Sequence, residues 1–208
     1  MILTTAPIVV AQQPPAPATA ADVIAHVQSY WQNMQSYQVP IVMSGSVKVS
    51  FLSVPFRMDG TEYYEAPDKQ ALHLNNVPPP ARGFENTVSN MGTPATWPLN
   101  YDITLKGTQP YGKHTAFVLV GTPKRGGNVK TMTMFVNVKT YAIEAVNFAY
   151  NNGASLVVSL SHHGLSPFHQ ATSATVDARF PGYTGSAQIF YGTYKFNVPI
   201  DPSVFEKR

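Results

Sequence analysis

Residues 131–160, TMTMFVNVKTYAIEAVNFAYNNGASLVVSL, contain the pattern that decides the fold. Apolar residues occupy alternate positions near both ends of this stretch, at Met132, Met134, Val136 and Val138 and again at Leu156, Val158 and Leu160. The intervening Asn151-Asn152-Gly153 is typical of a tight turn. Because alternation with a period of two is typical of strands that bury one face, the stretch predicts antiparallel strands joined by turns.

The same alternation recurs on both sides of this stretch. It appears at Val47, Val49 and Phe51, at Leu72 and Leu74, at Tyr101, Ile103 and Leu105, and at Val176, Ala178 and Phe180. Roughly ten short strands with no helices between them predict an antiparallel meander. A twisted sheet of that size tends to curl, which shortens its edges. We therefore expect a mainly β fold, an open antiparallel half-barrel with an apolar concave face.

Residues 19–37 carry the only long helical pattern. Thr19 and Asp22 have the spacing of a capping box, and an apolar stripe follows at helical spacing. Its members are Val23, Ile24, Val27, Trp31 and Met34. We expect one long N-terminal helix that buries this stripe by covering the concave side of the sheet.

Residues 1–18 lie outside the predicted fold. MILTTAPIVVA at 1–11 resembles the end of a secretory signal peptide, and the Pro/Ala-rich residues that follow are typical of a linker. The alternative is an apolar tail with no targeting role. We expect residues 19–208 to form a single domain in the periplasm or another extracytoplasmic compartment. No run of 18 or more apolar residues predicts a membrane-spanning helix.

Composition excludes several classes of protein. The chain has no cysteine, which excludes disulfide scaffolds, thiol enzymes and thiolate zinc sites, and removes the residue that a lipoprotein anchor needs. Its 14 Lys and Arg against 11 Asp and Glu are scattered along the sequence. A nucleic-acid binder concentrates positive charge on one face, so no nucleic-acid partner is expected.

Residues 75–98 interrupt the strand pattern with prolines and glycines. Phe84, Met91 and Trp97 are the apolar residues by which such a loop attaches to the body of a protein. A loop of this length is typical of a lid, and a surface excursion is the alternative.

The histidines at 162, 163 and 169 are the only candidate catalytic or metal-binding cluster. Adjacent residues on a strand point to opposite faces, so only one of His162 and His163 can approach His169. A catalytic zinc site usually takes three protein ligands, and no acid lies between Glu144 and Asp177. We expect a structural role in a hairpin end, no metal, no cofactor and no enzymatic activity; a hydrolase that uses these histidines is the alternative.

Four segments resemble the LolA-like family of periplasmic lipoprotein carriers and lipid-binding proteins. They are an amphipathic helix leading into a strand, AADVIAHVQSYWQNMQSYQVPIVMSG at 20–45, a Tyr-rich strand with a Pro turn, FRMDGTEYYEAPDKQALHL at 56–74, a hairpin, FVNVKTYAIEAVN at 135–147, and a closing strand, YKFNVPIDPSVF at 194–205. Asn137 replaces the usual Asp of the hairpin, and residues 75–98 replace the family's central segment. The resemblance implies an incomplete barrel with helices at its mouth and an apolar cavity for acyl chains.

The resemblance and the pattern together predict a non-enzymatic exported carrier or sensor. Its expected partners are a lipid or a lipidated protein, and envelope membrane proteins that load or receive it. The alternative is an envelope protein-interaction module whose barrel is filled by side chains. The candidate cavity and lid residues are Val27, Trp31, Val47, Val49, Phe51, Phe56, Met58, Leu72, Leu74, Phe84, Ile103, Leu105, Met132, Met134, Val136, Leu156, Val158, Ile189 and Tyr191.

Overall fold

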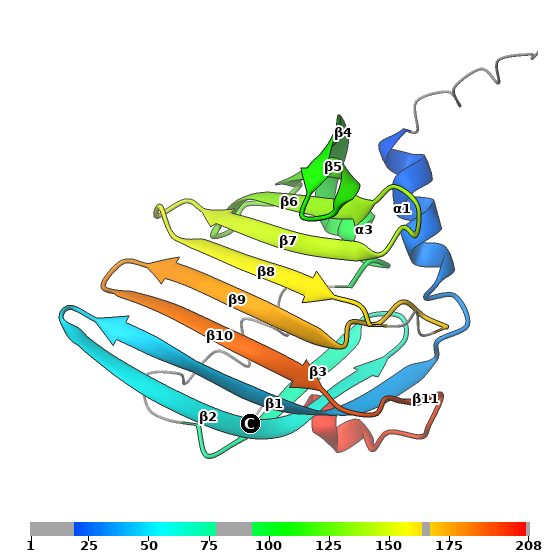
Figure 1. Ribbon diagram of the computed structural model, residues 1–208. Helices are drawn as coiled ribbons and strands as arrows, with labels where there is room; N and C mark the ends of the chain where they lie inside the picture. The colour runs from blue at the N-terminus through cyan, green and yellow to red at the C-terminus, as the bar shows by residue number, and fades with distance from the viewer. Residues whose placement is uncertain (1–18, 78–92, 164–166, 207–208) are drawn as a thin grey trace, which may run out of the picture.

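The computed structural model describes residues 19–77, 93–163 and 167–206, and its main element is one 11-stranded antiparallel sheet (Figure 1). The strand order is β3-β2-β1-β10-β9-β8-β7-β6-β5-β4, and β11 pairs with β1 beyond the end of β10. The strands are β1 Ser36–Val49, β2 Leu52–Glu65, β3 Lys69–Asn75, β4 Tyr101–Tyr111, β5 His114–Pro123, β6 Val129–Asn137, β7 Ile143–Tyr150, β8 Ser155–Ser161, β9 Ser173–Phe180, β10 Tyr183–Tyr191 and β11 Lys195–Phe196. The helical segments are α1 Ala20–Ser29, α3 Trp97–Asn100 and the 3-10 helix η2 Pro202–Phe205.

The sheet is open, as the sequence pattern predicts. Strands β4 to β10 follow one another as a meander, and β1 to β3 form a second antiparallel unit. The two units join where β1 pairs with β10, from Ile41 opposite Tyr191 to Val49 opposite Tyr183. Among the described strands, β3 and β4 remain as the two edges, so the mainly β, unclosed architecture is confirmed.

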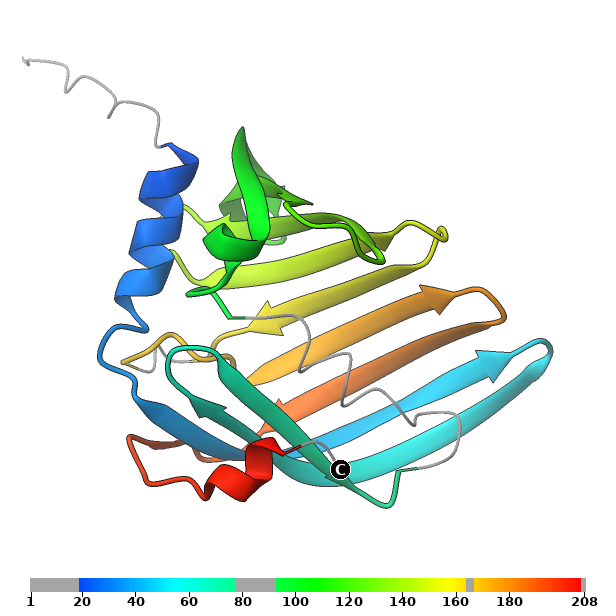
Figure 2. The ribbon, with the colours of Figure 1, turned by 180° about the vertical axis from the view of Figure 1, so that it is seen from behind.

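Close backbone contacts accompany the bend in β1 and β2, where the sheet curves most strongly (Figure 2). At Gly45 in β1, a Cβ atom would lie 2.8 Å from the Cα of Ala187 and 2.9 Å from Cζ of Phe56. Only glycine permits backbones to approach this closely. Gly45 therefore lets β10 and β2 pack tightly around the middle of β1.

The end of the β4–β5 hairpin folds onto the outer face of the sheet. A bulge between Leu105 and Thr108, with Gly107 at φ 112°, redirects this end of the hairpin. Tyr111 then stacks on Phe135 at 4.9 Å between ring centroids, and its hydroxyl lies 3.1 Å from Oγ of Ser159. This contact covers a small apolar cluster that is separate from the main core.

The N-terminal helix is shorter than the sequence pattern predicts. The capping box is present, because Thr19 Oγ1 accepts from Asp22 N at 3.1 Å and Thr19 N donates to Asp22 Oδ2 at 2.9 Å. The prediction of a helix over 19–37 is wrong, because α1 ends at Ser29 and β1 begins at Ser36. Asn197 holds the connecting segment: its Oδ1 accepts from Gln35 N at 2.8 Å and its Nδ2 donates to the Asn33 carbonyl at 3.2 Å. Strand pairing with the C-terminal segment thus replaces the last turns of the expected helix.

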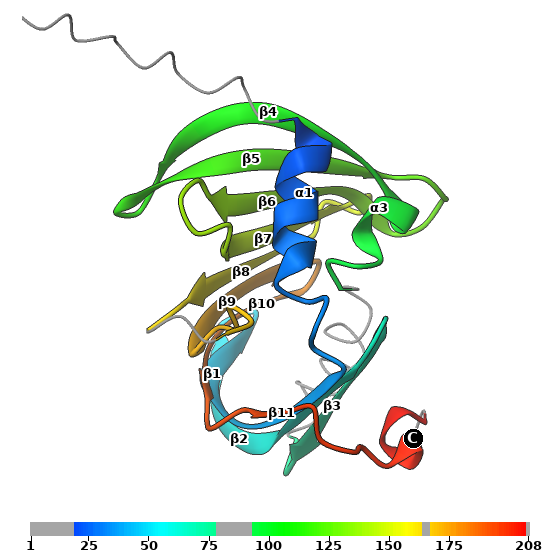
Figure 3. The same cartoon turned by 90° about the vertical axis from the view of Figure 1, so that its right-hand side faces the viewer.

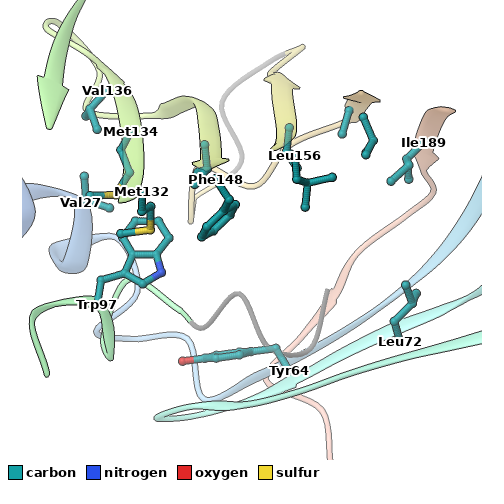
Figure 4. Close-up of a cluster of buried hydrophobic side chains, with 14 of the residues drawn as sticks. Val27, Tyr64, Leu72, Trp97, Met132, Met134, Val136, Phe148, Leu156 and Ile189 are labelled. Atoms are coloured by element: carbon teal, nitrogen blue, oxygen red, sulfur yellow. The ribbon is translucent and has the colours of Figure 1, made fainter. Parts of the chain in front are cut away.

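The core lies on the concave face of the sheet and includes the buried face of α1. Val23, Ile24 and Val27 are buried there with Met34, while Trp31 is half-buried. Figure 4 shows Val27 and Trp97 beside Met132, with Tyr64 and Leu72 on the opposite wall. The helix therefore covers the concave side, as expected from its apolar stripe.

Candidate binding site beneath the N-terminal helix

A cavity of about 160 Å³ lies at the end of the sheet that α1 covers. In the view of Figure 3, α1 lies across β4 to β8, and it contacts β4. The cavity is lined by Val27, Tyr30, Trp31, Tyr37, Glu62, Gln70, Thr93, Pro94, Trp97, Tyr141, Ala142, Ile143, Val146, Phe148, Val158, Leu160, His162, His169, Gln170, Ala171, Tyr191 and Tyr194.

Most of the cavity wall is apolar. Val27 and Trp31 contribute from α1 and the turn after it, and β7 and β8 contribute alternate residues such as Phe148 and Val158. The Trp31 and Tyr64 rings form a T-shaped pair, with 5.1 Å between centroids and an interplanar angle of 88°. This wall suits a hydrocarbon group, because apolar surface gains free energy when it leaves water.

A buried carboxyl lies in the same cavity. Glu62 of β2 is 8% exposed, and its Oε1 accepts from the Tyr37 hydroxyl at 2.5 Å and from Gln70 Nε2 at 3.4 Å. Burial raises the pKa of Glu62, and the two hydrogen bonds oppose that rise. Neither salt bridge in the described part of the chain involves this residue, so its charge has no cationic partner there.

Tyrosine rings surround this carboxyl. Tyr37 and Tyr194 meet edge to face at 5.5 Å, and Tyr191 stacks on Tyr194 at 6.0 Å. The Tyr194 hydroxyl donates to the Ala171 carbonyl at 2.9 Å. Burial is the main cause that raises the pKa of all three tyrosines, and the Glu62 charge adds to it. The hydroxyls therefore stay neutral across the physiological range.

Two histidines lie in the wall of the cavity away from this carboxyl. The Nε2 atom of His162 lies 3.0 Å from the Ile143 carbonyl oxygen, so Nε2 carries a proton and donates to it. The Nδ1 atoms of His162 and His169 are both buried without a hydrogen-bond partner. Burial is the main cause that lowers the pKa of His169, and the nearby His162 adds to it. These two ring nitrogens are therefore enclosed by protein atoms and do not face a ligand in the cavity.

The histidine cluster is divided as strand parity predicts. His162 and His169 reach the cavity, whereas His163 is exposed and its backbone N donates to Thr172 Oγ1 at 3.1 Å. Within residues 19–77, 93–163 and 167–206, no three His, Cys, Asp or Glu side chains are grouped as metal ligands.

Two aromatic stacks attach α1 to the sheet. The His26 ring stacks on Tyr141 with 4.3 Å between ring centroids. The ring of Tyr30, just after the helix, stacks on His169 with 3.6 Å between ring centroids. Tyr141 and His169 both adopt left-handed backbone conformations, each with φ 52°. The loops that carry them thus direct both rings toward α1, which forms the roof of the cavity.

The candidate residues from the sequence fall into groups of different exposure. Val27, Trp31, Val158 and Tyr191 line the cavity. Met58, Leu72, Met132, Met134, Val136, Leu156 and Ile189 are buried in the main core, and Val47 is also buried. Phe56, Leu74, Ile103 and Leu105 are half-buried against the core.

Three candidates do not join these groups. Val49 and Phe51 are at the far end of the β1–β2 hairpin, 46% and 94% exposed, and are not part of the cavity wall. The apolar alternation in the sequence continues to Val49 and Phe51, but at these positions no second layer covers the inner face of the sheet. Phe84 lies outside the described residues, as does most of the loop predicted at 75–98. Trp97, at the end of that loop, is buried and lines the cavity.

Among the polar residues of the cavity, the sequence singles out His162 and His169 but not Glu62 and Tyr194. Glu62 has the same strand parity as Met58 and Tyr64, and all three face the core. Parity therefore contained the signal for an inward-pointing carboxyl. Tyr194 had no such signal, because it lies in a connection whose path depends on tertiary contacts.

The described residues contain no helix long and apolar enough to span a membrane. No family model matches the sequence, and no curated protein matches it significantly.

Several solved structures share this fold. A DUF1329 family protein from Desulfovibrio piger is 12% identical, with a TM-score of 0.64 over 90% of this chain and 95% of that one. A putative outer membrane lipoprotein-sorting protein domain from Vibrio parahaemolyticus is 11% identical, with a TM-score of 0.62 over 89% of this chain and 95% of that one. A LolA superfamily protein from Nitrosomonas europaea is 11% identical, with a TM-score of 0.56 over 91% of this chain and 98% of that one. The chain thus has the fold of the LolA superfamily, as the sequence resemblance implies.

Proposed function

We propose that this chain, which has a LolA-like fold, is a non-enzymatic carrier or sensor that binds a lipid or the acyl chain of a lipidated protein. The observation that supports this most is the apolar cavity of about 160 Å³ between α1 and the inner face of the sheet. The lipoprotein-sorting description of one structural relative supports the same class of ligand. We further propose that the chain acts in the periplasm or another extracytoplasmic compartment, with membrane proteins that load or receive its ligand.

The size of the cavity indicates how a long ligand would enter. A cavity of about 150 Å³ holds a benzene-sized group, so an acyl chain needs more space than the closed structure provides. Burying each CH₂ group contributes about 0.8 kcal/mol. Each of the two ring stacks that hold α1 contributes about 0.5–1.5 kcal/mol. Val23, Ile24 and Val27 of α1 are themselves buried, at about 1.5–3 kcal/mol each, so full release of the helix would cost more than a few methylenes return. We therefore propose that α1 moves only far enough to admit the chain and keeps its apolar face against the ligand as a lid.

Purification from the native host followed by mass spectrometry of an organic extract tests the proposal. We expect acyl-chain lipids in stoichiometric amounts, and we expect the purified protein to bind a neutral fluorescent acyl-chain probe. A Val158→Trp variant fills the cavity wall and should reduce this binding, whereas Phe190→Trp, at an exposed position on the outer face, should not. Repeated preparations without lipid, together with no binding of the neutral acyl-chain probe, would contradict the proposal.

The second candidate is a protein-interaction module of the same fold. It is favoured by the size of the cavity, which lies below the roughly 300–1,000 Å³ of ordinary ligand pockets. In that case the Val158→Trp variant stabilises the protein against urea and no lipid is extracted.

A further inference from the structure

Glu62 is the acid that the carrier proposal leaves without a role. Its carboxyl lines the cavity and is buried among aromatic rings. Placing an ionised carboxylate in such a site is costly unless a cation accompanies it. No cation among the described residues forms an ion pair with Glu62 or lowers its pKa. A ligand that brings positive charge would supply what the protein does not.

The hydrogen bonds of Glu62 orient the carboxyl for a partner in the cavity. Tyr37 and Gln70 both donate to Oε1, so one oxygen of the carboxyl satisfies both protein donors. Among the described residues, none donates a hydrogen bond to Glu62 Oε2. This oxygen is also not one of the fully enclosed side-chain atoms that lack a hydrogen-bond partner. The second oxygen is therefore available to a donor from the ligand.

The rings beside Glu62 also favour a cation. Tyr37, Tyr191 and Tyr194 form a contiguous cluster with centroid separations of 5.5 and 6.0 Å. A cation within about 6 Å of a ring centroid is attracted by the face of that ring. All three hydroxyls stay neutral because their pKa values are raised, so these residues act as aromatic walls without adding competing negative charge.

We propose that Glu62 and the rings of Tyr37, Tyr191 and Tyr194 bind the protonated amine head of an acyl-chain ligand. This inference rests on the proposed function, because it assigns the head group of the ligand that the apolar wall holds. An N–H of the ammonium donates to Oε2, and the rings enclose its remaining surface. An anionic head would instead be repelled by the ionised carboxylate.

Three single-chain probes of equal length, decylamine, decanol and decanoate, test the inference at pH 8 by calorimetry below their aggregation concentrations. A primary amine stays protonated to about pH 10, as lysine does. We expect decylamine to bind at least about tenfold more tightly than decanol, the effect of one charge-assisted hydrogen bond. Propylamine tests whether the site needs the hydrocarbon chain as well as the amine. Much weaker binding of propylamine than of decylamine supports the proposal, and equal affinity for the two overturns it.

Two variants complete the experiment. Glu62→Gln keeps the size of the side chain and its bond with Tyr37, and should bring decylamine to the affinity of decanol while leaving decanol unchanged. Glu65→Gln, on the same strand but in an ion pair with Lys69, should preserve the preference. Binding of all three ten-carbon probes with equal affinity would overturn the amine site but leave the carrier function intact. Binding of none of them would overturn both.

Discussion

Replacing Gly45 with alanine should strongly destabilise the protein. The new Cβ would lie 2.8 Å from the Cα of Ala187 and 2.9 Å from Cζ of Phe56, and closer still to the carbonyl oxygen of Ser186. Two of these three atoms are backbone of β10, which cannot rotate away as a side chain can. Overpacking usually costs about 1–3 kcal/mol, and we expect about 3 kcal/mol here because the β1–β10 ladder itself must separate.

Gly185→Ala is the matched control. Gly185 lies on β10 opposite Val47, and its added Cβ would be 3.5 Å from the Ser46 carbonyl oxygen and 3.8 Å from Cγ2 of Val47, which are ordinary contacts. Both substitutions gain the same backbone-entropy benefit of about 0.5–1 kcal/mol, so the difference between them measures the steric cost.

Urea unfolding followed by tryptophan fluorescence measures this difference, and thermal unfolding provides a second measure. For a chain of this size, about 3 kcal/mol corresponds to a fall in Tm of about 6–12 °C. Gly185→Ala should remain within about 1 kcal/mol of the parent protein. If the free energies of unfolding of Gly45→Ala and Gly185→Ala agree within about 0.5 kcal/mol, the close approach of β10 to β1 does not exist in solution and the reasoning is refuted.

Three other predictions concern the core, the buried acid and the helix cap. Met34→Ala, at a fully buried position, should lower the free energy of unfolding by about 2–5 kcal/mol, whereas Leu99→Ala, at a 73% exposed position, should not change it measurably; equal effects in urea unfolding would contradict the burial of Met34. Because the pKa of Glu62 is raised, its protonated form stabilises the fold below about pH 4.5, and that contribution is lost as the pH rises through the raised pKa. Glu62→Gln should therefore gain stability relative to the parent as the pH is raised from 4 to 8, and a constant difference in unfolding free energy over that range would contradict the shift. Thr19→Ala removes the capping box and should cost about 0.5–2 kcal/mol, seen as faster amide exchange in α1; unchanged exchange would show that the cap does not hold the helix.

The architecture was largely predictable because one inner face is buried along nearly every strand. Alternation at Met132 and Met134, and again at Leu156 and Val158, places these residues on the concave side, where the structure buries them. Register follows from such alternation because a slip of one residue would expose the whole inner face. An open sheet with a helix on its concave side was therefore within reach of pattern alone.

The helix boundary and the polar site were not predictable in the same way. Residues 30–37 continue a helical pattern, but pairing of Tyr37 with Phe196 and the bonds from Asn197 draw them into the sheet. Those partners lie about 160 residues away in sequence, so no local pattern contains them. The partners of Glu62 likewise come from β1 and β3, and only the folded sheet brings Tyr37 and Gln70 to one carboxyl.

The pairing of β1 with β10 also determines when the molecule can complete its fold. Ile41 and Tyr191 are opposite each other in the ladder although 150 positions separate them in the sequence. During synthesis, β1 therefore leaves the ribosome with one edge unpaired until nearly the whole chain has emerged. Such long-range pairing slows folding, and an unpaired strand edge invites association with other chains. We therefore expect the protein to fold more slowly than a chain of the same size whose strands pair locally.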